Sequence, residues 1–464
     1  MARLPRKPLV AVVGATGTGK SQLAVEIARK FNGEIINGDA MQLYNGLPII
    51  TNKVTEEEMK GVPHHLLGVV GLEENTWTVE RFVKRAKDVI EDIRQRGRLP
   101  ILVGGTHYYT QSLVFDQGVK EEDRKPDHVP VLADKYPILN EPSSVILAKL
   151  REVDPVMADR WHPNDHRKIQ RSLEIYLQTG RPASQIYDEQ RQRRASDPTH
   201  EDALPDIDVV KPAARLTYDP LVFWINVPPT TLPDRLSARV DKMLASGLLS
   251  EVQSLDAHLL ARQAAGETVD RTRGIWISIG YKEFETYQAL TRADPPATVT
   301  ELEKAKAEAV DLVKIATRQY AKSQVKWIRT KLTHAFQAAD LSERLYLLDG
   351  SDISTFSENV EKPALELTER FLAGVEEMPL PASLGEAAAE MLSPKSSYDL
   401  STRPDLWQRK TCEACGTVSV TEEDWMKHVK GRRHQAVVKR RARTAVVVHD
   451  ASLDDRLERV SHQR

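Results

Sequence analysis

The chain has 464 residues, of which 41% are hydrophobic and 28% charged, and its formal net charge is −2. These values are ordinary for a globular protein of two to four domains, and the overall charge does not indicate nucleic-acid binding. No apolar run approaches the roughly 18 residues of a membrane span, and no secretory signal opens the chain. Because only two cysteines are present, a disulfide framework is excluded and a reducing compartment is expected.

The first hundred residues alternate between predicted strands and helices. Short apolar runs predict strands, and amphipathic stretches predict helices. In chain order these are the strand Leu9–Val13, the helix Ser21–Lys30, the strand Glu34–Asn37, the helix Arg81–Arg96 and the strand Leu99–Val103. This order predicts a parallel sheet covered by helices, and we assign residues 8–122 to the first part of this α/β core.

The rest of the chain divides into an insertion, the remainder of the core and a small C-terminal module. Residues 123–205 are polar, interrupted by prolines and helical in pattern, so we expect an inserted helical domain there. Within it, Asn164-Asp165 is expected to cap a helix that ends at Thr179-Gly180. The core resumes over 206–375. Its expected elements are the strands Leu221–Val227 and Leu345–Leu348 and the helices Leu232–Ser246, Val299–Arg329 and Val360–Phe371. Residues 376–403 are expected to be a linker, 404–443 a module and 444–464 a charged tail.

A glycine-rich loop lies between the first predicted strand and the first predicted helix. It reads G-A-T-G-T-G-K-S and fits the pattern G-x-x-x-x-G-K-[ST]. Glycines allow backbone N–H groups to converge on phosphate oxygens, and the helix N-terminus adds partial positive charge. Lys20 adds a full charge, and the Ser21 hydroxyl can hold Mg²⁺. The predicted phosphate site consists of Gly14, Ala15, Thr16, Gly17, Thr18, Gly19, Lys20 and Ser21.

Polar residues follow the second and third predicted strands. The second strand leads into N-G-D-A-M-Q-L-Y, and the third into G-G-T-H-Y-Y. The carboxyl ends of parallel strands face the ligand crevice, so Asp39, Gln42 and Thr106 are expected to surround the group that the loop holds. The loop alone leaves the ligand open, and ATP is its common partner. No predicted strand ends in the Asp-Glu pair typical of a motor ATPase.

These segments resemble the tRNA dimethylallyltransferase (isopentenyltransferase) family. Besides the loop and the two strand ends, the resemblance rests on T-N-K at Thr51–Lys53, H-P-N-D-H-R-K-I-Q-R at His162–Arg171, R-V-D-K-M-L-A-S-G at Arg239–Gly247, G-Y-K-E-F at Gly280–Phe284 and R-Q-Y-A-K-S-Q-V-K-W at Arg318–Trp327. The blocks span about residues 8–330 in the family's order. Ala40 stands where Ser is usual, and Ile277 where eukaryotic members usually have Gln.

The resemblance implies that the loop holds the pyrophosphate of dimethylallyl pyrophosphate and that the acceptor is the N6 amine of adenosine 37, beside the tRNA anticodon. Asp39 would be the general base, and Thr16, Lys20, Arg239 and Mg²⁺ on Ser21 would stabilise the leaving pyrophosphate. The implied tRNA contacts are Asp39, Ala40, Met41, Gln42, Thr106, Arg167, Lys168, Ile169, Gln170 and Arg171. From the residues alone, Asp39 could equally cap a helix, and Arg239 could be a solvated arginine.

The C-terminal module carries a metal-ligand pattern. Cys412-x2-Cys415-x12-His428-x5-His434 fits a Cys₂His₂ zinc site and uses both cysteines of the chain. Eukaryotic members of the family carry such a finger. Ten Lys or Arg residues against four Asp or Glu residues between Trp407 and Arg443 predict a basic surface that adds tRNA affinity. Trp425 is expected to form the core of this finger.

Two other functions remain open from the sequence. A P-loop kinase of a nucleotide or nucleoside would share the loop and the core, but it leaves the finger unexplained. A zinc-finger RNA-binding protein with a relic P-loop domain would lack catalysis. We expect a cytoplasmic monomer. Arg3, Arg6 and Lys7 also allow a mitochondrial presequence, and Lys439-Arg440-Arg441 allows nuclear import.

Overall fold

The computed structural model describes residues 5, 7–74, 76–115, 135–196, 216–375, 377–393 and 407–441. The chain divides into two compact units, each formed by two stretches of sequence. The first unit joins Met1–Gln117 with Val210–Ser397, and the second joins Gly118–Val209 with Tyr398–Arg464. None of the described helices is both long and apolar enough to cross a membrane.

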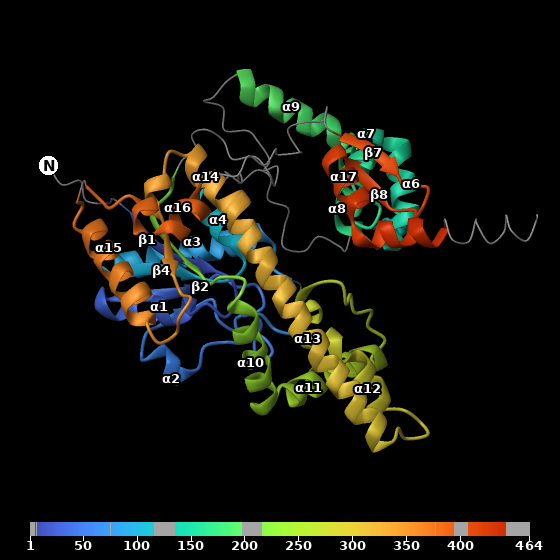
Figure 1. Ribbon diagram of the computed structural model, residues 1–464, viewed down its shortest axis with the longest axis horizontal. Coiled ribbons are helices and arrows are strands. Elements are labelled where there is room, and N and C mark those ends of the chain that lie inside the picture. Colours follow the sequence, from blue (N-terminus) through green and yellow to red (C-terminus); the bar gives the residue numbers. More distant parts are fainter. Residues whose placement is uncertain are drawn as a thin grey trace, which may run out of the picture. The chain divides into compact units, whose positions relative to one another are not determined.

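The first unit is built on a six-stranded sheet in the order β3-β2-β4-β1-β5-β6 (Figure 1). All its pairings are parallel, as the alternation of strands and helices predicts. The strands are β1 (Pro8–Gly14), β2 (Gly33–Asn37), β3 (His64–His65), β4 (Leu99–Val103), β5 (Asp219–Asn226) and β6 (Leu345–Asp349). Five of them were predicted. The two-residue strand β3 was not, because two residues carry no periodic signal.

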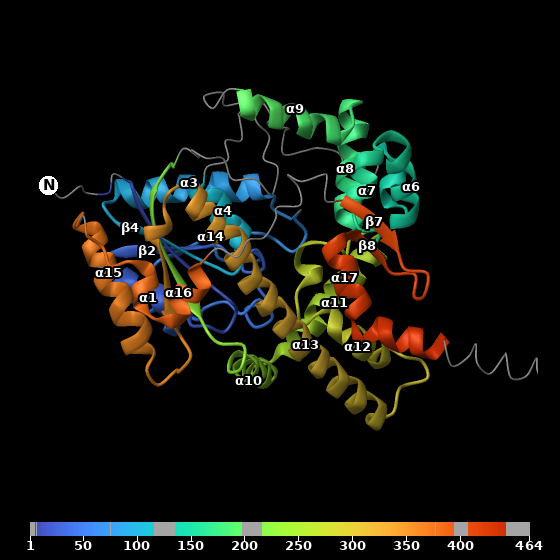
Figure 2. The same ribbon diagram turned by 45° about the horizontal axis from the view of Figure 1, so that its top comes forward.

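Helices cover both faces of this sheet. Alternate residues of β1 belong to different cores: Ala11 and Val13 to one, Val10 and Val12 to the other. Figure 2 shows α3 and α4 on one side of the strands and α1 and α15 on the other. The helices of this layered part are α1 (Lys20–Lys30), α2 (Glu56–Met59), α3 (Val79–Gln95), α4 (His107–Val114), α14 (Thr333–Ala338) and α15 (Lys362–Leu372).

A group of helices extends from one end of the sheet. It consists of α10 (Leu232–Ala245), α11 (Leu248–Ala264), α12 (Glu285–Thr291) and α13 (Val299–Trp327). The 29-residue helix α13 begins with a capping box formed by Thr298 and Glu301 and contacts both α10 and α12 (Figure 1). Its C-terminal part returns to the sheet and brings polar side chains to the phosphate loop.

Part of the segment predicted to be a linker is folded instead. Within 376–403, a 3-10 helix at Pro381–Leu384 and the helix α16 (Glu386–Leu392) pack on the core. Ala388 is buried, and the Tyr346 hydroxyl donates to the Pro379 carbonyl at 2.9 Å. The segment offers few large apolar side chains, so the apolar pattern expected of a packed helix was too weak to find. Residues 394–406 lie outside the described part.

The second unit combines the helical insertion with the C-terminal finger. Its helices between residues 135 and 196 are a 3-10 helix (Pro137–Asn140), α6 (Ser143–Val153), α7 (Pro155–Arg160), α8 (His166–Thr179) and α9 (Ala183–Ser196). No strand occurs between residues 135 and 196, in agreement with the predicted helical insertion. The finger contains the hairpin β7 (Trp407–Thr411) and β8 (Val418–Thr421), then α17 (Glu422–Lys430), and residues 432–441 form a further helix.

Buried Asp154 organises the insertion. Its carboxylate accepts hydrogen bonds from the Met157 N–H, at 3.1 Å, and from the Ser184 N–H, at 2.9 Å. It therefore caps α7 and fixes the start of α9 at the same time. Ile146, Leu150 and Leu173 pack around these caps as a separate apolar core.

Candidate active site

The phosphate loop follows β1 and has the backbone that its glycines allow. Gly19 has a φ of +90°, and a Cβ there would lie 2.6 Å from a ring carbon of Phe356. A Cβ on Gly14 would lie 2.6 Å from the Ile225 carbonyl oxygen. Both positions therefore exclude side chains. The buried Thr18 hydroxyl donates to the Ala15 carbonyl at 2.9 Å and closes the loop on itself.

Lys20 and Ser21 lie where the loop enters α1. The ammonium group of Lys20 donates to the Ala15 carbonyl oxygen at 2.7 Å across the loop. Burial, and then the positive charge of Arg239, lowers the pKa of Lys20 to about 7, although Asp39 opposes this shift. Ser21 is exposed, and its hydroxyl has no hydrogen-bond partner among the described residues. That hydroxyl is thus available to a cation at the loop.

Asp39 lies directly beyond the carboxyl end of β2. Its Oδ1 atom accepts a hydrogen bond from the Met41 N–H at 2.9 Å, so the carboxylate does cap the turn that follows. The Oδ2 atom has no hydrogen-bond partner in the described part of the chain. A Cβ on Gly105 would lie 3.0 Å from this oxygen. The same Cβ would lie 2.5 Å from Gln324 Nε2 and 3.7 Å from the Tyr320 hydroxyl, so Oδ2 lies beside Gly105 next to two polar side chains of α13.

Thr106 fixes the segment that follows Asp39. Its hydroxyl accepts the Ala40 N–H at 3.0 Å, and its own N–H donates to the Gly38 carbonyl at 3.3 Å. A Cβ on Gly104 would lie 2.2 Å from the carbonyl carbon of Gly38, so the ends of β2 and β4 are in direct backbone contact. The structure therefore gives Thr106 a positioning role next to Asp39.

Arg239 lies on α10 and is the third charged side chain of the site, after Lys20 and Asp39. Burial lowers the pKa of the Arg239 guanidinium, and the carboxylate of Asp39 raises it. Because Arg239 and Asp39 also both shift the pKa of Lys20, the three side chains share one electrostatic environment. The structure thus brings together the predicted loop, the predicted base and the predicted arginine.

Gln324 of α13 was not predicted as a site residue. Its Oε1 accepts the Thr16 N–H at 2.8 Å, and its Nε2 donates to the Gly105 carbonyl at 2.9 Å. Tyr320, one turn earlier, places its hydroxyl 3.5 Å from the same carbonyl oxygen. Gln324 is only 4% exposed, and no sequence signal identifies it, because both of its partners lie more than 200 residues away in the chain.

A side chain of α11 holds the segment from Gln42 to Lys53 in place. The side-chain amide of Gln42 donates to the Asn52 carbonyl at 2.9 Å. The carboxylate of Glu251 accepts the N–H groups of Ile49 and Ile50, with distances of 2.9 and 2.7 Å. Burial lowers the pKa of Lys53 to about 8, opposed by Glu251 and then Asp39. Glu251 and Lys53 are further residues near the site that sequence patterns did not assign.

His107 begins α4, one residue beyond Thr106. It is 3% exposed, and neither ring nitrogen has a hydrogen-bond partner among the described residues. Burial, and then the charge of Lys20, lowers the pKa of His107 to about 3. The imidazole is therefore neutral at physiological pH and too weakly basic for proton abstraction. Asp39 remains the group suited to that role.

The predicted tRNA-contact segment of the insertion forms the first turns of α8. Asp165 caps the helix, as predicted, and Gly180 ends it. The side chain of Ile169 is fully buried, and Gln170 donates to the Leu139 carbonyl at 2.9 Å. These two side chains hold the insertion together instead of facing a ligand. The exposed members of the predicted set are Arg167, Lys168 and Arg171.

The four predicted zinc ligands converge in the finger. Their ligand atoms all lie within 4.8 Å of one another. Cys415 Sγ lies 3.3 Å from His428 Nε2, and Cys412 Sγ lies 3.5 Å from His434 Nδ1. A tetrahedral Zn²⁺, with bonds of about 2.3 Å to sulfur and about 2.0 Å to nitrogen, separates its ligands by roughly 3.3–3.8 Å. The cluster therefore fits zinc. Trp425 packs beside His428, with ring centroids 5.8 Å apart.

The finger also carries most of its predicted basic residues on the surface. Lys427, Lys430, Arg432 and Arg433 are exposed, and so are Lys439, Arg440 and Arg441. Residues 442–443 of this predicted surface and the tail 444–464 lie outside the described residues. Lys427 is paired with Glu423 at 2.5 Å, which offsets part of the charge.

Similarity to known proteins covers nearly the whole chain. The family model described as IPP transferase matches residues 42–331. The tRNA dimethylallyltransferase of Schizosaccharomyces pombe is 35% identical, over 95% of this chain and 96% of that protein. The human tRNA dimethylallyltransferase is 32% identical, over 94% of this chain and 87% of that protein.

A solved structure extends this similarity to three dimensions. It is described as crystallographic snapshots of a eukaryotic dimethylallyltransferase acting on tRNA. Its TM-score is 0.70 at 32% sequence identity, and the match covers 96% of this chain and 99% of that one. The family model spans more than half of the chain, and the relatives match its insertion and finger as well as its core. The chain therefore belongs to the IPP transferase family, in its eukaryotic form.

Proposed function

We propose that the chain transfers the dimethylallyl group of dimethylallyl pyrophosphate to the N6 amine of adenosine 37 in tRNA. The observation that carries this proposal is that Gln324 ties the loop to Gly105 beside Asp39, and that Arg239 and Asp39 both shift the pKa of Lys20. Lys20 and Arg239 are cations suited to a pyrophosphate, and Asp39 is a carboxylate with a free oxygen. The names of the relatives over nearly their full length support the same reaction.

The reaction needs one bond to form and one to break. The adenine N6 atom attacks the first carbon of the prenyl group as the bond from that carbon to the pyrophosphate oxygen breaks. Asp39 Oδ2 takes the proton that N6 loses. Lys20, Arg239 and the loop N–H groups stabilise the charge that develops on the leaving pyrophosphate. Mg²⁺ held by the unpaired Ser21 hydroxyl would supply further positive charge there.

The implied tRNA contacts Asp39–Gln42, which would hold the target base and are called the base-recognition segment, have a backbone held in place by hydrogen bonds. Ala40 and Met41 are tied to Thr106 and Asp39, while Gln42 is tied to Asn52. The N–H and carbonyl groups of this segment are therefore fixed beside the proposed base. We assign Arg167, Lys168 and Arg171 to the tRNA backbone, because phosphate contacts supply most of the affinity for nucleic acid.

We also propose a cellular location and an oligomeric state for the chain. Both cysteines are positioned as zinc ligands, which suits a reducing compartment such as the cytosol. We propose that the chain acts as a monomer, because each residue assigned to the reaction comes from one chain. Measurement of the molar mass in solution at working concentration would test this.

The test is a transfer assay with an Asp39→Ala variant. Purified protein, Mg²⁺ and dimethylallyl pyrophosphate are incubated with unmodified tRNA, and the nucleosides are analysed by mass spectrometry. We expect a prenylated adenosine from the parent and at least about a hundredfold less from the variant, the usual scale of general-base loss. Donor binding should survive in the variant.

The same assay separates the alternatives. A P-loop kinase would consume ATP and leave the tRNA unchanged. An RNA-binding protein with a relic loop would bind tRNA without product. Absence of prenylated adenosine with the parent, over several tRNAs, would contradict the proposed reaction.

A further inference from the structure

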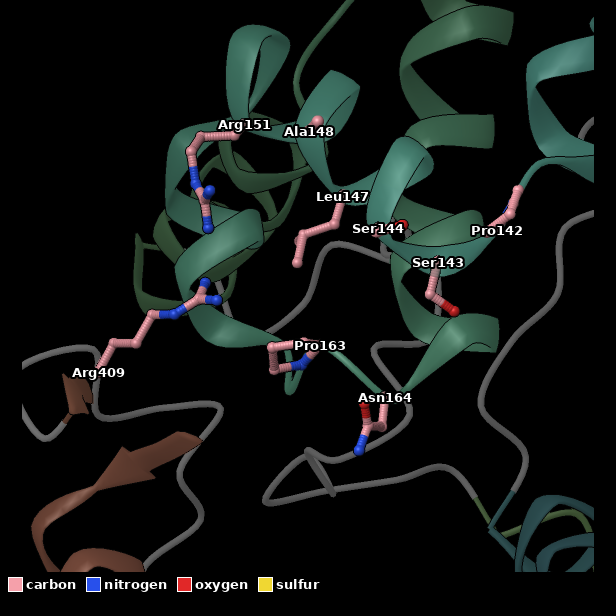
Figure 3. A pocket seen from close by; sticks show the side chains of 9 residues that line it. All are labelled: Pro142, Ser143, Ser144, Leu147, Ala148, Arg151, Pro163, Asn164 and Arg409. Carbon is pink, nitrogen blue, oxygen red and sulfur yellow. The ribbon is translucent and has the colours of Figure 1, made fainter. Parts of the chain in front are cut away.

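A pocket of about 490 Å³ lies within the second unit. It is lined by one side of α6, from Ser143 to Arg151, by the Pro163–Asn164 turn before α8, and by Arg409 of the finger strand β7 (Figure 3). Elements separated by more than half of the chain thus build one cavity, so the pocket exists only when the finger is folded against the insertion.

The lining of this pocket includes two arginines and no acidic residue. Figure 3 shows the guanidinium groups of Arg151 and Arg409 pointing toward one another from different elements. Arg151 is exposed and makes no hydrogen bond or ion pair within the described residues. Two like charges that face one another repel, and an anion between them removes that repulsion.

Arg409 is already oriented by the insertion. Its Nη1 lies 3.4 Å from the Ala158 carbonyl oxygen, to which it donates, and 3.7 Å from the Asp159 carboxylate. A guanidinium has five N–H donors, so these contacts leave several for a ligand. Because Asp159 interacts with only one of the two arginines, the pocket keeps a net positive charge.

We propose that Arg151 and Arg409 together hold one backbone phosphate of the tRNA. Guanidinium groups match the planar, bidentate geometry of phosphate oxygens. Asn164 on the rim is followed directly by Asp165, the cap of the helix that carries Arg167, Lys168 and Arg171. The pocket therefore continues the surface assigned above to tRNA. This inference rests on the proposed function, because that function makes RNA the substrate.

The assignment gives the finger a definite role in recognition. Arg409 lies on β7, which ends at Thr411 directly before the predicted ligand Cys412, so zinc binding would fix its position. The finger and the insertion would then bind the RNA through one shared surface, because each contributes one of the two arginines.

The test measures tRNA affinity against salt concentration. The zinc-loaded full chain is compared with Arg151→Gln, Arg409→Gln and the double variant by fluorescence anisotropy. We expect each single change to weaken binding about tenfold, the usual loss of a charge-assisted hydrogen bond. Each should also reduce the slope of log Kd against log salt by about 1. The double variant should lose no further slope, because the same phosphate is lost only once.

Lys149→Gln is the matched control. Lys149 lies on the same helix, pairs with Glu152 at 2.6 Å and does not line the pocket, so its loss should change affinity less than about twofold. Zinc content and melting temperature verify that the Arg409 variant keeps its finger. If the Arg151→Gln variant binds tRNA with the affinity and the salt slope of the parent, the proposal is overturned. A slope loss of about 2 in the double variant would mean two separate phosphates and would overturn the shared site.

Prenyl transfer by the parent is measured in the same preparations. Suppose that the parent transfers the prenyl group and that the Arg151→Gln variant binds tRNA like the parent. The proposed phosphate site would then be refuted, and the proposed reaction would stand.

Discussion

At the scale of single residues, the charge of Lys20 depends on its surroundings. Burial, and secondly Arg239, lowers its pKa to about 7, so the free protein holds this lysine partly neutral at physiological pH. A bound pyrophosphate brings negative charge next to the ammonium group and raises its pKa again. Binding of the donor is therefore linked to uptake of a proton by Lys20.

This linkage predicts a pH dependence of donor affinity. The protonated form binds the anion better and is lost as the pH rises through about 7, so affinity should be highest below that value. We expect the Kd for dimethylallyl pyrophosphate to rise about tenfold between pH 7 and pH 9, measured by calorimetry without tRNA. Lys20→Met should bind weakly at every pH. A flat profile for the parent would contradict a lysine that titrates near neutrality.

At the scale of elements, Glu251 connects α11 to the segment beside the proposed base. It accepts the first N–H groups of the turn at Ile49 and Ile50, and that turn ends at Asn52, whose carbonyl orients Gln42. A carboxylate at the start of a helical turn also interacts favourably with its free N–H groups. One side chain thus positions the predicted base-recognition segment from about 200 residues away in sequence.

Replacement of this side chain should weaken tRNA use more than donor use. We expect Glu251→Ala to lower kcat/KM for tRNA about tenfold, because two N–H groups lose their acceptor. Glu251→Gln keeps an acceptor and should restore most of the activity, while the donor Kd stays unchanged in both. Gln253→Ala, an exposed position on the same helix, is the control. Equal losses in donor and tRNA binding would argue for general destabilisation instead.

Elements with strong local patterns were the ones that the sequence could predict. The strand–loop–helix at Gly14–Ser21, the cap at Asp165 and the four zinc ligands all depend on neighbours within a few residues. Gln324 and Glu251 act on segments hundreds of residues away. Their roles depend on tertiary contacts that leave no periodic signal, and the same holds for α16, which folds only against a core formed elsewhere.

At the scale of the whole molecule, the proposed donor site and the zinc finger belong to different units. The phosphate loop lies in the first unit, and the zinc cluster with Arg409 lies in the second. Removal of zinc should therefore raise the KM for tRNA at least about fivefold and leave the donor Kd unchanged, because the metal supplies most of the finger's folding energy. Activity before and after chelation, with zinc added back, tests this. An unchanged KM for tRNA after confirmed zinc loss would refute it.

The stability of the first unit should depend on Glu34 of β2. Its side chain is 1% exposed and contacts Arg96, Arg98 and His65. Burial alone would raise the pKa of Glu34, but hydrogen bonds from Arg96 and then His65 lower it to about 2. The ionised carboxylate therefore stabilises the fold fully above about pH 4.5, and this contribution is lost as the pH falls toward 2.

A Glu34→Gln variant tests this interaction. We expect its free energy of unfolding at pH 7 to be about 2 kcal/mol lower than that of the parent. The difference should shrink as the pH falls from about 4.5 toward 2, because the unfolded chain binds a proton at Glu34 before the folded protein does. Urea unfolding at these pH values measures the difference in free energy of unfolding. The control is Asp92→Asn, which removes only an exposed partner of Arg96. A difference that stays undiminished down to about pH 2 would exclude the ionised carboxylate as its source.

The strand order has a consequence for synthesis on the ribosome. β1 lies between β4 and β5, and its residue Pro8 pairs with Asp219. During translation, one edge of this fully apolar strand stays unpaired while the whole helical insertion emerges. Exposed apolar edges favour association with other chains, so the nascent N-terminal part needs shielding until β5 arrives. The insertion proposed to bind tRNA thus lengthens an interval of synthesis in which the chain is prone to aggregate.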